Sequence, residues 1–353
     1  MTASEGVLTR PLERLGRDAL FLVWGTPSQG PRSRVFAKEL GIEAAFVHST
    51  KRRGPVTAPL RYTSQAVKTL LLLSRRRPRV VFVQSPPSFA VMFVALYCGL
   101  TGASFLVDAH SAAMQLPYWT RPRWLHALLA RRAVATIVTN ERFAGIIHGS
   151  GGRALVIRDI PTSFPGGRRR PTGAGFNVLV VNTFSADEPL REVVAAAREV
   201  PEATFHVTGD TRRERGRIPP DRPGNVRFTG FLPTEAYYEL MASSDAVMCL
   251  TTRDDTMQRG ACEALSMGRP IITSDWPLLR DYFSKGTVHV DNGAIGIRDG
   301  VRAMMRHHSR YEADIISLQG QQRREWVSAL ESLVRLVDSS LARGADHRAR
   351  GVG

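Results

Sequence analysis

The chain has 353 residues, enough for two domains of ordinary size, and its 43% hydrophobic content is that of a globular protein. Its three scattered cysteines give no disulfide framework and no zinc-ligand spacing, which fits a reducing compartment, and the charged N-terminus does not read as a signal peptide. The net charge of +16 is unevenly distributed. Residues 1–175 contain 25 Arg and Lys and 8 Asp and Glu (+17), whereas residues 176–353 contain 23 Arg and Lys and 24 Asp and Glu (−1). We therefore expect the first half to bind an anionic partner; the alternative is that the charge only reflects an arginine-rich composition.

The first predicted elements are a strand at residues 21–24, a glycine-containing loop at 25–30 and a helix from Arg32 to Leu40. A strand, loop and helix in this order begin a nucleotide-binding type of α/β domain. The loop lacks the spacing of the dinucleotide and P-loop motifs, so by itself it is a weak signal, and a plain turn is the alternative.

Residues 80–107 carry no charge and require a decision between a membrane span and buried elements. Pro86 and Pro87 interrupt the stretch, and the apolar run after them is shorter than the ~20 residues that span a bilayer. We therefore predict a strand at 80–83, an apolar helix at 89–100 and a strand at 104–107.

His110 follows the last of these strands, at the end where open α/β sheets bind ligands. We predict that it hydrogen-bonds a ligand hydroxyl or acts as a base, with a structural histidine as the alternative. Trp119, Trp124 and the basic residues at 121–132 suit either a membrane interface or an ordinary helix.

The second half begins after a linker predicted at residues 164–175, which is rich in Arg, Gly and Pro. Strands are predicted at 176–182, 204–208 and 226–229, followed by Phe231 in a turn. A long amphipathic helix is predicted at 319–341, and the Arg- and Gly-rich tail from 342 is predicted to be disordered.

The most informative stretch is residues 246–273, which reads as strand, polar loop, short helix and strand. Helix N–H groups that open out of such a loop favour a phosphate or an anionic sugar donor. Asp255 in the loop and Glu263 in the helix are suited to bind sugar or ribose hydroxyls, and we interpret neither as half of an ion pair at helix spacing; a solvated loop and helix surface is the alternative.

This stretch resembles the E-x7-E segment of the retaining GT-B glycosyltransferases of family 4, with Glu263-Ala-Leu-Ser-Met-Gly-Arg-Pro270 in place of their EAM-x-x-G-x-P run. The resemblance implies that Glu263 binds the donor ribose and that Asp255, here in place of Glu, lies near the sugar hydroxyls. It also implies that the donor site includes Arg253, Thr256, Met257, Arg259 and Gly260, with Phe231 near the base. In a GT-B enzyme the loop that here contains Gly30, Arg32 and Arg34 faces the donor phosphates. Family 4 enzymes carry an Arg and a Lys for the diphosphate where this chain has Thr183 and Glu188; the candidate substitutes are Arg32, Arg34, Arg253 and Arg259.

A second resemblance is to the chitobiosyl-diphosphodolichol β-mannosyltransferases, whose QNPP and DWH segments are similar to Gln84-Ser-Pro-Pro87 and Asp108-Ala-His110. The family 4 resemblance implies retention of the anomeric configuration and the mannosyltransferase resemblance implies inversion, so both outcomes stay open.

Together the resemblances imply an α/β protein of the GT-B fold, with two Rossmann-like parallel-sheet domains facing a cleft. We expect an acceptor-side domain at 1–172, a nucleotide-sugar domain at 173–341 whose final helix returns to the first domain, and a tail at 342–353. The expected activity is transfer of a hexosyl group from a nucleotide-sugar to a lipid-linked or other glycan acceptor, as in polysaccharide or glycolipid biosynthesis. We expect no metal and no other cofactor, although Asp254 and Asp255 offer a metal pair as an alternative.

The expected location is the cytoplasm, with peripheral attachment to an anionic membrane surface. Basic residues near an anionic leaflet contribute about 1 kcal/mol each, so four of them on one side give roughly 4 kcal/mol, enough for reversible attachment. The alternatives are a catalytically silent sugar-binding paralogue and a basic nucleic-acid-binding protein, and no nucleic-acid-binding motif supports the latter.

Overall fold

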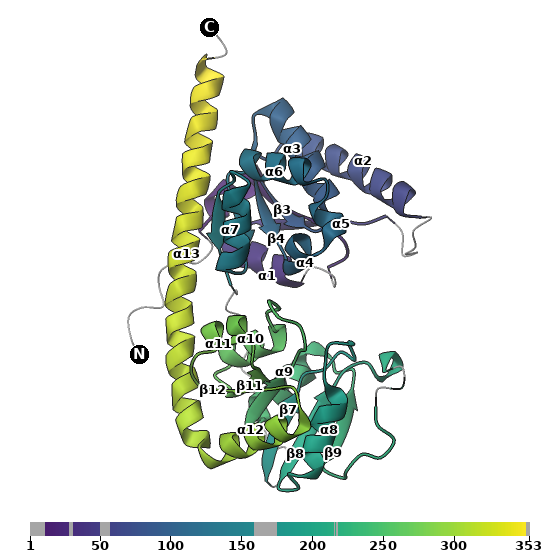
Figure 1. Ribbon diagram of the computed structural model, residues 1–353. Helices are drawn as coiled ribbons and strands as arrows, with labels where there is room; N and C mark the ends of the chain where they lie inside the picture. Colours follow the sequence, from purple (N-terminus) through teal and green to yellow (C-terminus); the bar gives the residue numbers. More distant parts are fainter. Residues whose placement is uncertain are drawn as a thin grey trace. The chain divides into compact units, whose positions relative to one another are not determined.

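The structure is a computed structural model that describes residues 11–27, 31–49, 57–158, 175–214, 216 and 218–350 (Figure 1). The chain divides into two compact units, the first comprising residues 1–160 and 325–353 and the second residues 161–324. The predicted linker at 164–175 lies outside the described residues except for Gly175.

Unit 1 contains a six-stranded parallel sheet in the order β2-β1-β3-β4-β5-β6. Its strands are β1 (Ala19–Trp24), β2 (Glu43–Val47), β3 (Val80–Ser85), β4 (Ser104–Ala109), β5 (Thr136–Val138) and β6 (Ala154–Val156). Its helices are η1 (Glu13–Asp18), α1 (Pro31–Leu40), α2 (Ala58–Arg76), α3 (Ser88–Thr101), α4 (Ser111–Gln115), α5 (Pro117–Thr120), α6 (Arg123–Arg132) and α7 (Glu141–Gly149).

Strand β1 shows why this sheet is buried on both faces. Leu20, Leu22 and Trp24 pack into a cluster with α2, α3, α6 and α7. Phe21 and Val23, which alternate with them, pack into a second cluster with α1 and the last part of α13 (His308–Arg350). A strand apolar at every position is expected where helices cover both faces of a parallel sheet.

Unit 2 repeats this architecture with the strand order β12-β11-β10-β7-β8-β9, all parallel. Its strands are β7 (Phe176–Val180), β8 (Ala203–Thr208), β9 (Val226–Gly230), β10 (Ala246–Cys249), β11 (Ile271–Ser274) and β12 (Thr287–Val290). Its helices are α8 (Leu190–Arg198), η2 (Thr211–Arg213), α9 (Thr234–Ser243), α10 (Arg259–Ser266), α11 (Pro277–Tyr282) and α12 (Ala294–Arg306), to which α13 adds its first part.

Two parallel sheets, each covered by helices, confirm the predicted α/β class with two Rossmann-like domains. Residues 80–107 fold as β3, α3 and β4, so the interpretation as strand, helix and strand is confirmed. Helix α13 extends to Arg350, through most of the segment that composition predicts to be disordered. Within the described ranges, no helix has both the length and the apolar character that a membrane span needs.

Candidate functional site

The first group of candidate residues lies in unit 1 where the winding of the sheet reverses. Strand β1 is flanked by β2 on one side and β3 on the other, so successive crossovers run in opposite directions from this point. Ligands of open parallel sheets bind at such switch points, beyond the carboxyl ends of the strands. Ser33 at the start of α1, Gln84 at the end of β3 and Asp108 at the end of β4 are buried there.

The Asp108 carboxylate is the centre of this group. Its Oδ2 lies 3.2 Å from Nε2 of His110 and 3.3 Å from the hydroxyl of Ser33, whose proton is shared with Oε1 of Gln84 at 2.8 Å. Nε of Arg32 lies 3.7 Å from Oδ1, close enough for an ion pair and too far for a hydrogen bond. Because the Asp108 side chain is only 1% exposed, these polar neighbours replace water around its charge.

These neighbours keep the Asp108 carboxyl ionised. Burial by itself would raise the pKa of Asp108, but the His110 ring, the Arg32 guanidinium and the Ser33 hydroxyl outweigh it and leave the pKa lowered. An ionised carboxylate only accepts hydrogen bonds, so Nε2 of His110 carries a proton, and Nδ1 can accept one when the ring is neutral. The His110 side chain is 25% exposed, which leaves the ring accessible as a base.

In unit 2 the winding reverses between β7 and β10, and α10 begins beside the ends of these two strands. Gly260 makes this close approach possible, because a Cβ there would lie 2.8 Å from Cγ1 of Val181 and 2.9 Å from Sγ of Cys249. The N-cap residue Gln258 makes no side-chain hydrogen bond to the helix, and its backbone is extended. The first turn of α10 therefore presents backbone N–H groups at the switch point, a favourable position for an anion.

Glu263 lies one turn into α10 and is buried, at 7% exposure. Oε1 accepts hydrogen bonds from Nε of Arg259 at 2.8 Å and from the Tyr238 hydroxyl at 3.4 Å, and Oε2 accepts one from the Tyr237 hydroxyl at 3.0 Å. The interpretation that Glu263 has no basic partner at helix spacing is therefore wrong, because Arg259 is four residues before it and pairs with it. A carboxylate has about four acceptor positions, so Oε2 has one left for a ligand hydroxyl.

Tyr237 and Tyr238 of α9 are the functional candidates that the sequence analysis missed. Burial and then the negative charge of Glu263 raise the pKa of each phenol, so both remain neutral donors to the carboxylate. Their only signal in the sequence is a pair of tyrosines on a helix that follows the turn at Phe231. Nothing in that pattern indicates a carboxylate 25 or 26 residues later as their partner.

Residues 253–257 form the turn between β10 and α10. Asp255 has a φ of 52°, in the left-handed region that few residues other than glycine adopt, and its N–H donates to Oδ1 of Asp254 at 2.6 Å. Arg253, whose side chain is 66% exposed, has Nη2 3.6 Å from Oδ1 of Asp187. Thr256 donates to the Asp254 carbonyl at 3.2 Å, and Met257 packs against the core under α10. Strained backbone of this kind is common at ligand sites.

The loop after β7 contains the two positions, Thr183 and Glu188, at which family 4 enzymes carry the Arg and Lys that bind the donor diphosphate. The Glu188 carboxylate accepts hydrogen bonds from the N–H groups of Thr183 at 2.9 Å and Ser185 at 2.8 Å, and from the Thr183 hydroxyl at 2.9 Å. The two positions read as replacing Arg and Lys are thus bonded to each other and close the loop. In unit 2, Arg253 and Arg259 remain the candidate cations near the start of α10.

The other predicted residues have mixed outcomes. Arg32 is fixed within unit 1, where Nη2 donates to the carbonyl of Ile157 at 2.9 Å, and Arg34 is exposed on α1. Phe231 follows β9 and is 75% exposed, as an aromatic ring that stacks on a ligand base would be. Gly30 lies outside the described residues. The structure therefore forms two groups, Arg32 with His110 around Asp108, and Arg259 with Glu263 next to Gly260.

Two protein families match the chain. The family described as "Glycosyl transferase 4-like domain" matches residues 6–162, and the family described as "Glycosyl transferase-like" matches residues 187–327. No curated protein matches the chain significantly.

Solved structures with a similar fold include three glycosyltransferase-related proteins. A sucrose-phosphate synthase from Thermosynechococcus elongatus has a TM-score of 0.69 and 14% identity, over 92% of this chain and 100% of that one. A glycosyltransferase from Rickettsia africae has a TM-score of 0.66 and 10% identity, over 92% and 98%. Anabaena HepE in complex with UDP has a TM-score of 0.63 and 14% identity, over 91% and 100%. At these identities the similarity concerns the fold.

Proposed function

The chain belongs to the GT-B glycosyltransferases of the family 4 type, and from this we propose that it transfers a hexosyl group from a nucleotide-sugar donor to a lipid-linked or other glycan acceptor. Unit 2 binds the donor, and unit 1 binds the acceptor and supplies the base. The observation that carries the proposal is the start of α10, where the N-terminal end of the helix and the remaining acceptor position of Glu263 lie within one turn of each other.

The donor is a nucleotide diphosphate sugar in this proposal. Helix amides attract its phosphates, Oε2 of Glu263 accepts a ribose hydroxyl, and the exposed ring of Phe231 stacks on the base. UDP-hexoses are the first donors to test, because HepE was solved with UDP, with UDP and glucose, and with UDP-glucose.

Departure of the nucleoside diphosphate leaves negative charge near α10. The helix amides together with Arg253 and Arg259 stabilise this charge in our proposal, and the reaction needs no metal. Asp255 binds hydroxyls of the transferred sugar in this proposal. The diphosphate is thus bound without the Arg and Lys pair of other family 4 enzymes.

His110 is the proposed catalytic base. Its Nδ1 accepts the proton of the acceptor hydroxyl, while Asp108 stabilises the imidazolium that forms. A base of this kind serves direct displacement with inversion, whereas membership of the family 4 type implies retention. The anomer of the product tests this choice.

The acceptor is proposed to be lipid-linked because unit 1 contains the basic part of the chain. The enzyme is then cytoplasmic and held at the inner face of the cell membrane. A phosphate or diphosphate that links glycan to lipid is attracted by the same positive field as the membrane.

Thermal stabilisation by a panel of nucleotides and nucleotide-sugars tests the donor site, followed by transfer assays with and without EDTA. We expect one nucleotide diphosphate sugar to raise the melting temperature and transfer to continue in EDTA. Stabilisation without transfer or donor hydrolysis would identify a sugar-binding paralogue instead. That second candidate is favoured by the closed Thr183–Glu188 loop, which provides no cation for the diphosphate.

A further inference from the structure

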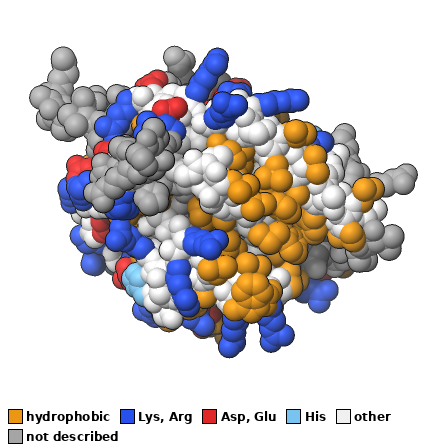
Figure 2. Space-filling model, turned by 90° about the horizontal axis from the view of Figure 1, so that it is seen from above, with side chains coloured by type: hydrophobic (Ala, Val, Ile, Leu, Met, Phe, Trp, Pro, Cys, Tyr) orange, Lys and Arg blue, Asp and Glu red, His pale blue; other side chains and the backbone are white. Residues whose placement is uncertain are grey.

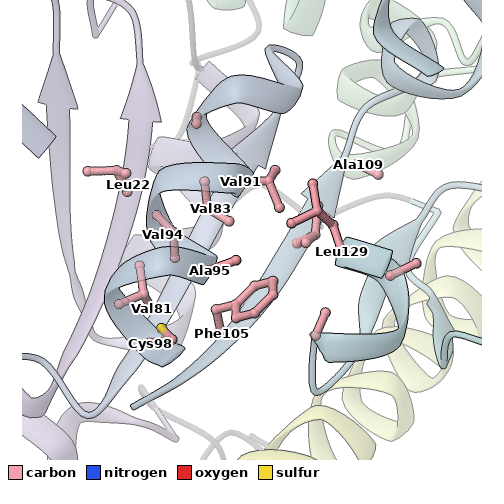
Figure 3. Close-up of a cluster of buried hydrophobic side chains, with 14 of the residues drawn as sticks. Leu22, Val81, Val83, Val91, Val94, Ala95, Cys98, Phe105, Ala109 and Leu129 are labelled. Carbon is pink, nitrogen blue, oxygen red and sulfur yellow. The ribbon is translucent and has the colours of Figure 1, made fainter. Parts of the chain in front are cut away.

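Helix α3 is apolar on both of its faces, although only one of them is buried in the protein. Val91, Val94, Ala95 and Cys98 point into the core above Leu22, Val81, Val83 and Phe105 of the sheet (Figure 3). The opposite face carries Phe89, Leu96 and Leu100, which are 43%, 49% and 79% exposed. A helix without a single charge is normally surrounded by protein or lipid, so this outer face calls for a cover.

The neighbouring helices extend this apolar surface. Helix α3 packs between α2 and α6, and both contribute large hydrophobic side chains to the same side of unit 1. Figure 2 shows hydrophobic side chains gathered into one broad patch on this side, bordered by arginine and lysine. We name the following exposed residues the apolar face: Leu60, Val67 and Leu71 of α2, Phe89, Leu96 and Leu100 of α3, Tyr118 of α5, and Trp124 and Leu128 of α6.

The charges on the three main helices of the apolar face are all of one sign, although Arg76 pairs with Glu43 of β2. Helices α2, α3 and α6 contain no Asp or Glu. They contain seven cations, namely Arg61, Lys68, Arg75, Arg76, Arg123, Arg131 and Arg132. Arg131 and Arg132 also line a depression of about 890 Å³ with Arg153 and Arg343, next to the C-terminal end of α3. Positive charge therefore surrounds the apolar face on several sides.

We propose that the apolar face inserts into the surface of an anionic lipid bilayer, with the surrounding arginines on the lipid phosphates. Its composition is that of an interfacial surface, with leucines, a valine and one phenylalanine, cations at the border, and Tyr118 and Trp124, which suit the headgroup region. This proposal specifies how the chain attaches to the membrane, and it rests on the lipid-linked acceptor proposed above. It adds that attachment is hydrophobic as well as electrostatic.

A second copy of the chain fits this surface less well. A two-fold symmetric contact would place the same patch against itself and bring two borders of like charge together. An acidic protein partner would need acidic side chains around an apolar centre, whereas an anionic leaflet supplies both features everywhere. The bilayer is therefore the occupant that the charge pattern favours.

The test is co-sedimentation of the full chain with vesicles of phosphatidylglycerol or of phosphatidylcholine, at low and high salt and without any donor. We expect binding to phosphatidylglycerol that falls with salt but persists at 1 M, because salt screens the arginines and not the apolar insertion. Trp124 is 68% exposed, so its fluorescence should be quenched by brominated lipid in vesicles. The variant Trp124→Phe should lose most of that quenching.

Two double variants and a matched control distinguish insertion of the apolar face from nonspecific adsorption to vesicles. Leu100→Glu combined with Leu96→Glu should lower the partition coefficient on the order of 10-fold or more and remove binding at high salt. Arg75→Gln combined with Arg123→Gln should lower it about fivefold per arginine, at low salt only. Ile295→Glu is the control, since Ile295 is 68% exposed on unit 2.

Several results would overturn the proposal. One is equal binding of the leucine variant and the wild type, and another is binding that vanishes at high salt. A third is a dimer that the leucine substitutions dissociate, without vesicle binding, which would identify a protein interface. Transfer to a water-soluble acceptor is measured separately: a chain that binds vesicles but transfers no sugar refutes the proposed function and leaves the membrane face standing.

Discussion

Replacing Glu263 separates its two tasks, because the carboxylate both binds donor hydroxyls in our proposal and accepts three hydrogen bonds from the protein. Glu263→Gln keeps the shape but loses the charge. A hydrogen bond to a charged group contributes about 1.5–3 kcal/mol, so we expect donor affinity to fall roughly 10- to 150-fold. Isothermal titration with the donor found by the thermal screen measures this.

Glu263→Ala is expected to damage stability as well. It leaves the buried Tyr237 hydroxyl without its acceptor, which costs about 1–3 kcal/mol. We add nothing for Arg259, whose side chain is 45% exposed, or for Tyr238 at 3.4 Å. For a unit of this size the loss corresponds to a melting temperature about 2–12 °C lower, measurable by calorimetry.

Glu235→Gln on the exposed surface of α9 is the control and should change neither quantity. Wild-type donor affinity in Glu263→Gln would refute the assignment of the donor site to α10. An unchanged melting temperature in Glu263→Ala would show that the hydrogen bonds to this carboxylate do not stabilise unit 2.

Three further predictions concern other parts of the molecule. The pKa of Asp108 is lower in the fold than the ~3.9 of an unfolded chain, so the stabilisation by its carboxylate is complete above pH ~4 and is lost as pH falls through the lowered value. The free energy of unfolding, measured in urea, should therefore fall less in acid for Asp108→Asn than for the wild type. An equal fall in both proteins would contradict the hydrogen bonds and ion pairs described around Asp108. Gly260→Ala should weaken donor binding about tenfold or more, because a Cβ at this position would push α10 away from Val181. Gly145→Ala on α7 is the control, since a Cβ there meets open space and should leave donor binding unchanged. Titration of both variants with the donor measures the difference. Burial raises the pKa of Cys98 to about 12, so thiol reagents at pH 8 should modify it only after unfolding, and modification of the native protein would show that α3 opens.

Local patterns in the sequence predicted many of the elements and their order, although α7 and β6 were not predicted. The apolar run from Phe21 to Trp24 predicts a strand, and the two prolines after β3 favour buried elements over a membrane span. His110 was identified as a candidate because a residue that follows a buried strand must lie at the ligand-binding edge of a parallel sheet. The charge difference between the halves of the chain is a property of the sequence alone.

The partners of these residues were decided by the tertiary structure. Asp108 meets Ser33, 75 positions earlier, because β1 and β4 end at the same edge of one sheet, and no local period encodes that meeting. Glu263 meets Tyr237 for the same reason. Its pairing with Arg259 was visible at helix spacing and was overlooked, whereas the tyrosines were not visible.

Helix α3 shows most clearly what the sequence alone does not predict. Its sequence is apolar all round, so it predicts a helix in contact with apolar surroundings on every side and does not say which side meets protein. Only the packing of α2 and α6 beside it leaves Leu96 and Leu100 on an open surface next to arginines. Composition determines how much apolar surface must be covered, and the arrangement of the helices on the sheet determines where it remains exposed.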